Sequence, residues 1–245
     1  MISISSLNKK FGKLHVLKDI NITFEMGVSY AMMGPNASGK TTLIKSILGM
    51  VIPNSGTILV NGEDIKDQWL YRSNIGYMPQ IGKYPENIKI GQVLSMIQNL
   101  RKDKNQYDTD LVEDFGLLQM LNKPMGTLSG GTRQKVSGAL AFMFDPDIYI
   151  LDEPTAGLDP LAVEALKKKI AKERAKGKLI IITSHILSDL DELTSHAIYL
   201  SDGEVFYNNS IEILKSETGE EKFSSSIARL MEWSEEKIKK TSIEL

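Results

Sequence analysis

Cysteine is absent from this sequence of 245 residues, and histidine occurs only three times. Without cysteine the chain forms no disulfide bond and no thiolate metal site, so we expect it to work in the reducing cytoplasm. The histidines (His15, His185 and His196) do not have the spacing of metal ligands. The eleven methionines are scattered, and we interpret those in apolar stretches as filling gaps in a core. We therefore expect no structural or catalytic copper.

Long apolar runs are missing as well. No stretch approaches the roughly 18 apolar residues needed to cross a bilayer, and residues 1–5 lack the charged-then-apolar pattern of a secretory signal. The formal net charge is only −2, with acidic and basic residues mixed along the chain, which argues against a nucleic-acid-binding protein. A hydrophobic content of 42% is enough for a folded core. Any membrane role is expected to depend on a partner protein.

Short apolar stretches alternate with helical patterns along much of the chain. The stretches that read as buried strands are 28–33, 148–151, 179–183 and 197–200. Helical spacing is found in 40–50 and in 160–176, and Pro160 suits the first turn of the second helix. This alternation predicts an α/β fold with a mostly parallel sheet covered on both faces, which binds ligands at the carboxyl ends of its strands.

The region from about residue 85 to residue 145 has helical patterns and no convincing strand. Helical spacing is found in 90–100, 110–118 and 131–144. We interpret this region as a helical lobe inserted into a sheet domain that covers residues 1–216. Charge rises in the tail, 217–245, where 223–233 has the pattern of an amphipathic helix.

A phosphate-binding loop follows the first predicted strand. Its residues fit the pattern G-x-x-x-x-G-K-[ST] between a strand and a helix, the context that the motif requires: Gly34, Pro35, Asn36, Ala37, Ser38, Gly39, Lys40 and Thr41, with Thr42 directly after them. Backbone N–H groups of such a loop wrap a polyphosphate, and the helix adds its positive N-terminal end. Lys40 is expected to reach the β- and γ-phosphates, and the Thr41 hydroxyl to bind Mg²⁺. The motif alone predicts nucleoside triphosphate binding and does not separate a kinase, a GTPase and a transport ATPase.

Two acidic residues end the second predicted strand. Asp152 suits the Mg²⁺ shell, and Glu153 suits a base that orients the water attacking the γ-phosphate. Two adjacent carboxylates after four apolar residues are costly to bury without a cation. Beside a phosphate loop, we interpret the pair as part of the same site.

The segment Leu128-Ser129-Gly130-Gly131-Thr132-Arg133-Gln134 resembles LSGGQ, the signature of the ABC transporter ATPases, with Thr132 in place of glutamine. It precedes a helix, so Ser129, Gly130 and Gly131 are expected to form a second anion site. In that family the signature of one subunit faces the γ-phosphate held by the phosphate loop of the other. The resemblance therefore implies a head-to-tail homodimer that closes over two ATP molecules.

Further elements of the same family occur in order along nearly the whole chain. Gln80 matches the Q-loop glutamine, which implies contacts with Mg²⁺ and water and a link to the helical lobe. Asp159 matches the D-loop, and His185 matches the switch histidine that contacts the γ-phosphate. Phe11 lies where the family has an aromatic ring that stacks on adenine. Taken singly, each of these residues is as readily explained by solvation or core packing.

The resemblance implies an ABC-type P-loop NTPase fold with an antiparallel β subdomain and the inserted helical lobe. It implies an ATPase with ATP and Mg²⁺ as cofactors, in which Glu153, His185, Gln80 and Lys40 act in catalysis. It also implies a membrane permease as partner and a peripheral location on the cytoplasmic face of the cell membrane. The permease is expected to contact a groove between the helical lobe and the sheet.

Three stretches, 79–97, 131–146 and 218–231, are similar to the ATPase of the nitrous-oxide-reductase maturation (Nos) transporter. That likeness implies a role in copper-site assembly, with a periplasmic accessory protein reached through the permease. The short tail is also similar to ATPases of ABC-2-type exporters, so an exporter of that type is the alternative to the Nos role.

Two other classes stay open from the residues. An ABC ATPase outside transport is disfavoured, since the chain has neither a long coiled-coil insertion nor a second cassette. A nucleotide sensor that does not hydrolyse is disfavoured by Glu153 and His185.

Overall fold

The structure, a computed structural model, describes residues 1–101 and 107–243, and the chain divides into two compact units. The first unit contains Met1–Tyr71 and Ile181–Leu245, and the second contains Arg72–Ile180. The predicted helical lobe falls within the second unit, although its residues 102–106 lie outside the described part. The predicted division into a domain of residues 1–216 and a tail stays a prediction.

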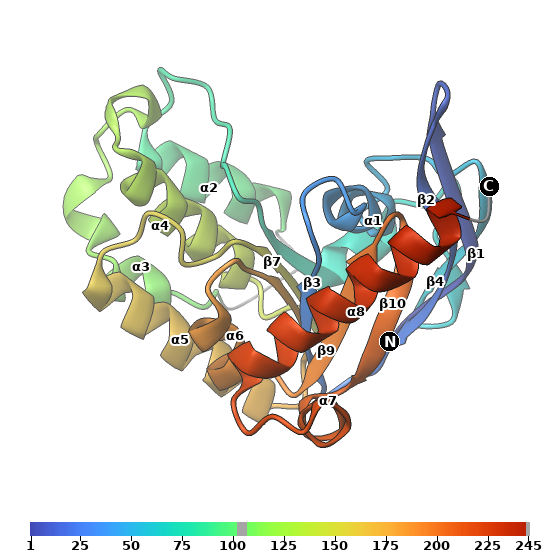
Figure 1. The fold of residues 1–245 in the computed structure, drawn as a ribbon. Coiled ribbons are helices and arrows are strands. Elements are labelled where there is room, and N and C mark those ends of the chain that lie inside the picture. Colours follow the sequence, from blue (N-terminus) through green and yellow to red (C-terminus); the bar gives the residue numbers. More distant parts are fainter. Residues whose placement is uncertain (102–106, 244–245) are drawn as a thin grey trace. The chain divides into compact units, whose positions relative to one another are not determined.

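An antiparallel sheet makes up one part of the first unit. Its strands pair in the order β2-β1-β4-β5 (Figure 1), with bounds β1 Ile2–Phe11, β2 Leu14–Phe24, β4 Ser55–Val60 and β5 Glu63–Asp64. Alternate residues face the core, as Ile2 and Ile4 do on β1. The alternation identifies a half-buried sheet, the antiparallel subdomain that the family resemblance implied.

The rest of the first unit is built around strand β3 (Ser29–Met33), which is buried at all five residues. It pairs in parallel with β9 (His196–Ser201), which pairs antiparallel with β10 (Glu204–Ser210). Helix α1 (Lys40–Ile47) follows β3 after a short loop. Strand β8 (Leu179–Thr183) is also fully buried, and the boundary between the units falls inside it. The sequence located β3, α1, β8 and β9 correctly to within a few residues, and it did not locate β10.

The end of the chain is helical. Helices α6 (Leu187–Leu193) and α7 (Ile211–Thr218) both pack against α8 (Phe223–Ile243), the long red helix of Figure 1. The amphipathic helix predicted for 223–233 is therefore correct in its start and ten residues too short at its end.

In the second unit, β6 (Ile75–Met78) and β7 (Ile148–Asp152) pair in parallel. Helices α2 (Ile90–Leu100), α4 (Gly130–Phe142) and α5 (Pro160–Ala175) agree closely with the predicted ranges. The described residues also form three short 3₁₀ helices: η1 Leu70–Asn74, which begins in the first unit, η2 Leu117–Met120 and η3 Met125–Thr127. Among the described residues between 85 and 144 there is no strand, only an isolated bridge between Lys89 and Pro124.

The helix predicted over 110–118 is wrong in its length. Helix α3 ends at Asp114 (Asp110–Asp114), and Gly116 then has φ +66°. A glycine in this left-handed conformation stops an α-helix, and η2 follows it. The apolar spacing continued across the break, so periodicity alone could not show it.

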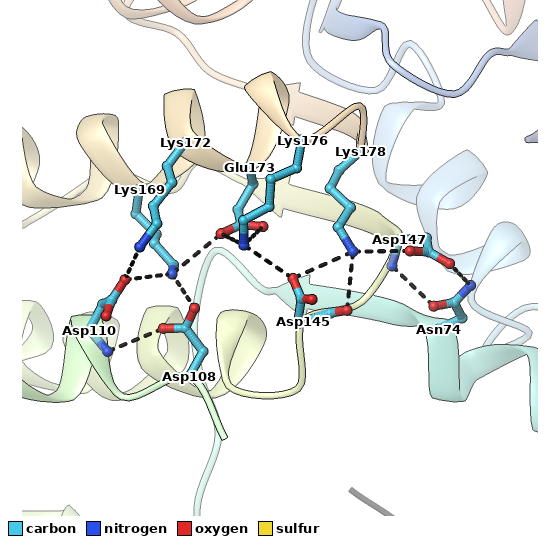
Figure 2. A network of polar contacts seen from close by, with 10 residues as sticks. All are labelled: Asn74, Asp108, Asp110, Asp145, Asp147, Lys169, Lys172, Glu173, Lys176 and Lys178. Carbon is cyan, nitrogen blue, oxygen red and sulfur yellow. Dashed lines mark hydrogen bonds and ion pairs between the residues drawn. The ribbon is translucent and has the colours of Figure 1, made fainter. Parts of the chain in front are cut away.

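A chain of ion pairs joins α5 to the segments that precede α3 and β7. Figure 2 shows Lys169 of α5 pointing toward Asp108, Asp110 and Glu173, and all three carboxylates lie within ion-pair distance of its ammonium. Lys169 is 3% exposed and Glu173 is fully buried. Burial acts to lower the pKa of Lys169, but hydrogen bonds to Asp108 and Asp110 outweigh it, so this pKa is raised and the lysine stays charged.

Within the described part of the chain, no helix has the length and apolarity of a membrane span.

Candidate nucleotide site

The phosphate loop lies in the first unit, between the buried strand β3 and the start of α1. Two of its glycines allow no side chain. A Cβ on Gly34 would lie 2.1 Å from the carbonyl oxygen of Leu200, and Gly39, at φ +104°, would bring a Cβ within 2.8 Å of the Leu17 side chain. The loop backbone is therefore pressed against β9 and β2, which fixes its path before any ligand arrives.

Lys40 places its ammonium inside this loop, where it donates to the carbonyl oxygens of Gly34 (2.7 Å) and Pro35 (2.9 Å). Ser38 is buried, and its hydroxyl has no hydrogen-bond partner among the described residues. The positive charge, the unpaired Ser38 hydroxyl and the N–H groups at the start of α1 fit a polyphosphate group. No acidic residue in the first turn of α1 opposes an anion there.

Ala37 has a backbone conformation that the motif did not reveal. Its φ is +63°, in the left-handed region that costs an L-residue roughly 1–2 kcal/mol. The loop thus carries strain at an exposed position, which its packed neighbours must hold.

Two other predicted residues lie in the same unit. Phe11 ends β1 with 49% of its surface exposed, and the Lys9 ammonium lies 4.8 Å from its ring centroid. The ring is thus accessible for stacking on a base. His185 is exposed in the loop between β8 and α6.

Gln80, Asp152 and Glu153 belong to the second unit, at the ends of its two paired strands. Met78 of β6 lies opposite Leu151 of β7, and Gln80 and Glu153 each lie two residues beyond this pair. The carboxyl ends of parallel strands meet at one edge of a sheet, which brings these side chains to one edge. Asp152 is buried, and Glu153 has φ +52°.

The pKa of Tyr77, in β6, is affected by the Asp152 carboxylate at this edge. Burial, with a smaller contribution from the nearby Asp152 carboxylate, raises the pKa of Tyr77 to about 12. The tyrosine therefore stays neutral next to an acid that is suited to a cation.

The signature segment begins α4 in the second unit. Ser129 is the N-cap, and its hydroxyl accepts from the N–H of Thr132 (3.2 Å) and contacts the Thr132 hydroxyl (2.9 Å). A Cβ on Gly130 would meet nothing within 4 Å, so the first turn is open to an approaching group. The threonine that replaces the family glutamine thus supports the serine hydroxyl.

Asp159 is the N-cap of α5, where its Oδ1 accepts from the Ala162 N–H at 3.0 Å. Its Oδ2 pairs with Lys135 of α4 at 2.6 Å. The hydrogen bond from Lys135, followed by that from Ala162, lowers the pKa of Asp159 below its usual value. Sequence reasoning missed Lys135 and the buried Gln134 beside it. Gln134 lies three and Lys135 four residues after Gly131, a spacing that places all three residues on one helix face.

Comparison with known proteins gives a consistent result. A family model described as ABC transporter matches residues 17–156. The lantibiotic transport ATP-binding protein SrtF of Streptococcus pyogenes is 30% identical over 233 residues, which cover 93% of this chain and 97% of that protein. The Nod factor export ATP-binding protein I of Burkholderia lata is 30% identical over 207 residues, covering 82% and 68%.

Solved structures agree with these relatives. An ATP-binding subunit of an ABC transporter has a TM-score of 0.88 and 27% identity, and the match covers 94% of this chain and 99% of that one. A dimeric ATP-binding cassette bound to ADP and Pi has a TM-score of 0.74 at 22% identity, which supports the fold alone.

Proposed function

Because this chain belongs to the ABC transporter family, as an ATP-binding and ATP-hydrolysing subunit that uses ATP with Mg²⁺, we propose that two copies of it form a homodimer that drives a membrane permease. The observation that carries this proposal is that two helices of one chain, α1 and α4, begin at glycine-containing segments whose N–H groups suit an anion. A ligand with one triphosphate needs only one of them. Two such sites per chain suit a pair in which each nucleotide is bound by both subunits.

Residues of the first unit hold the nucleotide in this proposal. Lys40 binds the β- and γ-phosphates and Thr41 binds Mg²⁺, while Phe11 stacks on adenine. His185 contacts the γ-phosphate. The buried Ser38 hydroxyl and the Lys40 ammonium, which is already drawn over the loop, support this assignment.

Residues of the second unit carry the chemistry and the contacts with the other subunit. Asp152 and Gln80 complete the Mg²⁺ shell, and Glu153 accepts a proton from the attacking water. Ser129, Gly130 and Gly131 bind the γ-phosphate of the partner's nucleotide. Asp159 lies between the two sites of the dimer.

Closure and reopening follow from these contacts. Only closure brings Ser129 to the γ-phosphate held by Lys40 of the other subunit, so ATP binds the closed dimer more strongly than the open one. ATP therefore shifts the population to the closed state. Hydrolysis removes the phosphate bridge and the pair reopens.

A hollow in the second unit supports the expected permease contact. It has a volume of about 260 Å³ and lies where β6, α2 and α4 meet, with Ile97, Leu100, Ala141 and Phe144 among its lining residues. Arg101 closes one side, donating to the carbonyl oxygen of Ser73 at 2.6 Å. We propose that a permease segment with apolar side chains docks here, which would hold the ATPase on the cytoplasmic face of the membrane. β6 leads directly to Gln80, so a displaced β6 would move that residue.

For the cargo, the relatives named for lantibiotic transport and Nod factor export favour an ABC-2-type exporter. The Nos maturation role, with its periplasmic accessory protein, is the alternative and rests on the three similar stretches of sequence. Both share the same ATPase cycle, because cargo is selected by the permease.

The test uses the Glu153→Gln protein, which should bind ATP and close without hydrolysing it. We expect it to run as a dimer in size-exclusion chromatography with ATP and Mg²⁺ and as a monomer when Ser129→Ala is added. A Glu153→Gln protein that turned over ATP at the native rate would refute the assigned base. Pull-down of the closed dimer from native membranes then identifies the permease. A permease recovered with a Nos accessory protein supports the maturation role, and a different permease supports an exporter. Recovery of no permease argues against a role in transport.

A further inference from the structure

Helix α4 is tied to the segment between β7 and α5 by an ion pair. Lys135, one turn after the signature glycines, places its ammonium 2.6 Å from Oδ2 of Asp159. The lysine side chain is 19% exposed and that of the aspartate 50%. This distance is that of a charge-assisted hydrogen bond, which is stronger and more directional than a surface ion pair at 4 Å.

The Asp159 carboxylate is held at both of its oxygens. While Oδ2 pairs with Lys135, Oδ1 accepts from Ala162 at the start of α5. The aspartate thus joins two helices, and its charged form is favoured first by the lysine. A residue held in this way has little freedom to move without either α4 or α5.

Two further contacts link the same helix face to the same segment. Gly131 packs so closely on the backbone that a Cβ there would lie 2.3 Å from the carbonyl oxygen of Gly157. The buried Gln134 donates to the carbonyl oxygen of Glu153 at 3.4 Å. Glu153 itself has φ +52°, a conformation that persists only where its surroundings hold it.

We propose that Lys135 is a positioning residue: through Asp159 it fixes the segment 153–159 against α4, so that Glu153 and the signature serine of one chain move as a single piece. This inference rests on the proposed function of Glu153 and Ser129. When Ser129 binds the nucleotide held by the partner subunit, α4 is fixed in place. The ion pair between Lys135 and Asp159 then fixes Glu153 as well, which acts on the nucleotide held by its own subunit. The Lys135 ammonium is engaged by Asp159, and Lys135 is not one of the proposed nucleotide-binding residues, so we expect its loss to affect the hydrolytic step more than nucleotide affinity.

The first experiment compares Lys135→Met with Lys135→Arg. Because the ion pair orients the segment that carries Glu153, we expect kcat for ATP to fall about three- to tenfold in Lys135→Met, with KM changed by less than about twofold. Lys135→Arg keeps the charge and should stay within about twofold of the native kcat. Lys172→Met is the matched control, since Lys172 forms a pair of similar length, 2.8 Å, with Asp110 on the surface.

A second variant guards against a folding defect. Asp159→Asn keeps an N-cap acceptor for α5, because asparagine caps helices as well as aspartate, but it removes the charge that Lys135 binds. Asp159→Asn should lower kcat like Lys135→Met, and the double variant should be no slower than either single one. Lys135→Met is also placed in the Glu153→Gln protein, where ATP-dependent dimer formation should need an unchanged ATP concentration.

The outcomes separate this inference from the proposed function. If Lys135→Met keeps its kcat within about twofold, or if the two single effects simply add, the positioning role is wrong while the ATPase assignment stands. The same holds if the kcat of Lys172→Met falls equally. If the Glu153→Gln protein hydrolyses ATP normally, the proposed site itself fails, whatever Lys135 does.

Discussion

The two units hold their functional loops by different means. In the first, the phosphate loop is fixed by backbone packing: Gly34 lies against Leu200 and Gly39 against Leu17, with no room for a methyl group. The second also has a close backbone contact, that of Gly131 on Gly157, but ion pairs are added to it: Lys135 of α4 binds Asp159, and further ion pairs run along α5 (Figure 2).

The difference teaches what each unit can tolerate. Where two backbone segments are in direct contact, no side chain can move aside to make room for a new atom. A substitution at such a glycine therefore displaces the whole loop. An ion pair can lengthen, exchange partners or lose its charge, and its strength depends on burial and pH. We therefore expect abrupt losses in the first unit and graded, condition-dependent effects in the second.

The largest effect is predicted for Gly34→Ala. The new Cβ would lie 2.1 Å from a carbonyl oxygen in β9, so β3, β9 or the loop must shift. We expect the free energy of unfolding to fall by about 3 kcal/mol or more and ATP binding to be lost. Urea denaturation and nucleotide binding measure both. Gly12→Ala is the control: Gly12 also has a positive φ but open space around it, so about 1 kcal/mol is expected. Equal losses for the two would contradict the role of backbone contact.

A slightly smaller effect is expected for Lys169→Met in the second unit. It leaves the Asp108 and Glu173 carboxylates without their shared buried cation, although Glu173 keeps Lys176. We predict a loss of about 3 kcal/mol in the free energy of unfolding. The exposed pair of Lys172 should lose less than about 1 kcal/mol in Lys172→Met. Comparable losses in the two denaturation curves would show that burial does not set the strength of these pairs.

A smaller, pH-dependent effect is predicted for Asp110. Hydrogen bonds from Lys172 and then Lys169 lower the pKa of Asp110 from its usual 3.8 to about 2. A lowered pKa means that the ion pairs stabilise the folded state fully above pH 4, and that this stabilisation is lost as the pH falls toward 2. Because the side chain is nearly half exposed, less than about 1 kcal/mol is expected. The difference in unfolding free energy between the native protein and Asp110→Asn should shrink over this range, and a constant difference would argue against the shifted pKa.

The smallest effect is predicted for Ala37→Gly in the phosphate loop. Glycine relieves the strain of φ +63° but adds freedom to the unfolded chain, so we expect a net gain of only about 0.5 kcal/mol. The control is Ala31→Gly in the buried strand β3, where φ is not positive and about 1 kcal/mol should be lost. A loss in both variants would indicate that the left-handed backbone at Ala37 carries no strain.

Much of the fold could be predicted because it depends on local patterns. The continuous apolar run at 179–183 and the helical spacing at 90–100 match β8 and α2 residue for residue. The strands of the antiparallel sheet were not located from the residues because bulges break the alternation of apolar and polar side chains, as between Ile4 and Leu7.

The sequence proposed the residues of the site but not the contacts that support them. Motif spacing and the family resemblance singled out Lys40, Ser129 and Asp159 as candidates. They could not show that Lys135 reaches Asp159, because that contact depends on how α4 packs across the start of α5. Nor could they show the positive φ of Ala37 and Glu153, which tertiary packing imposes against their own preference.

The long helix at the end of the chain decides how the protein can be shortened. Phe223, Ile227 and Leu230 of α8 are buried, and the Ser234 hydroxyl forms a buried hydrogen bond with that of Ser201 in β9. An expression clone that stopped at residue 216 would lack this apolar strip, uncover the parts of α6 and α7 that pack against α8, and leave the Ser201 hydroxyl without Ser234, so the product should aggregate. An affinity tag should therefore extend the chain beyond α8 without cutting into it.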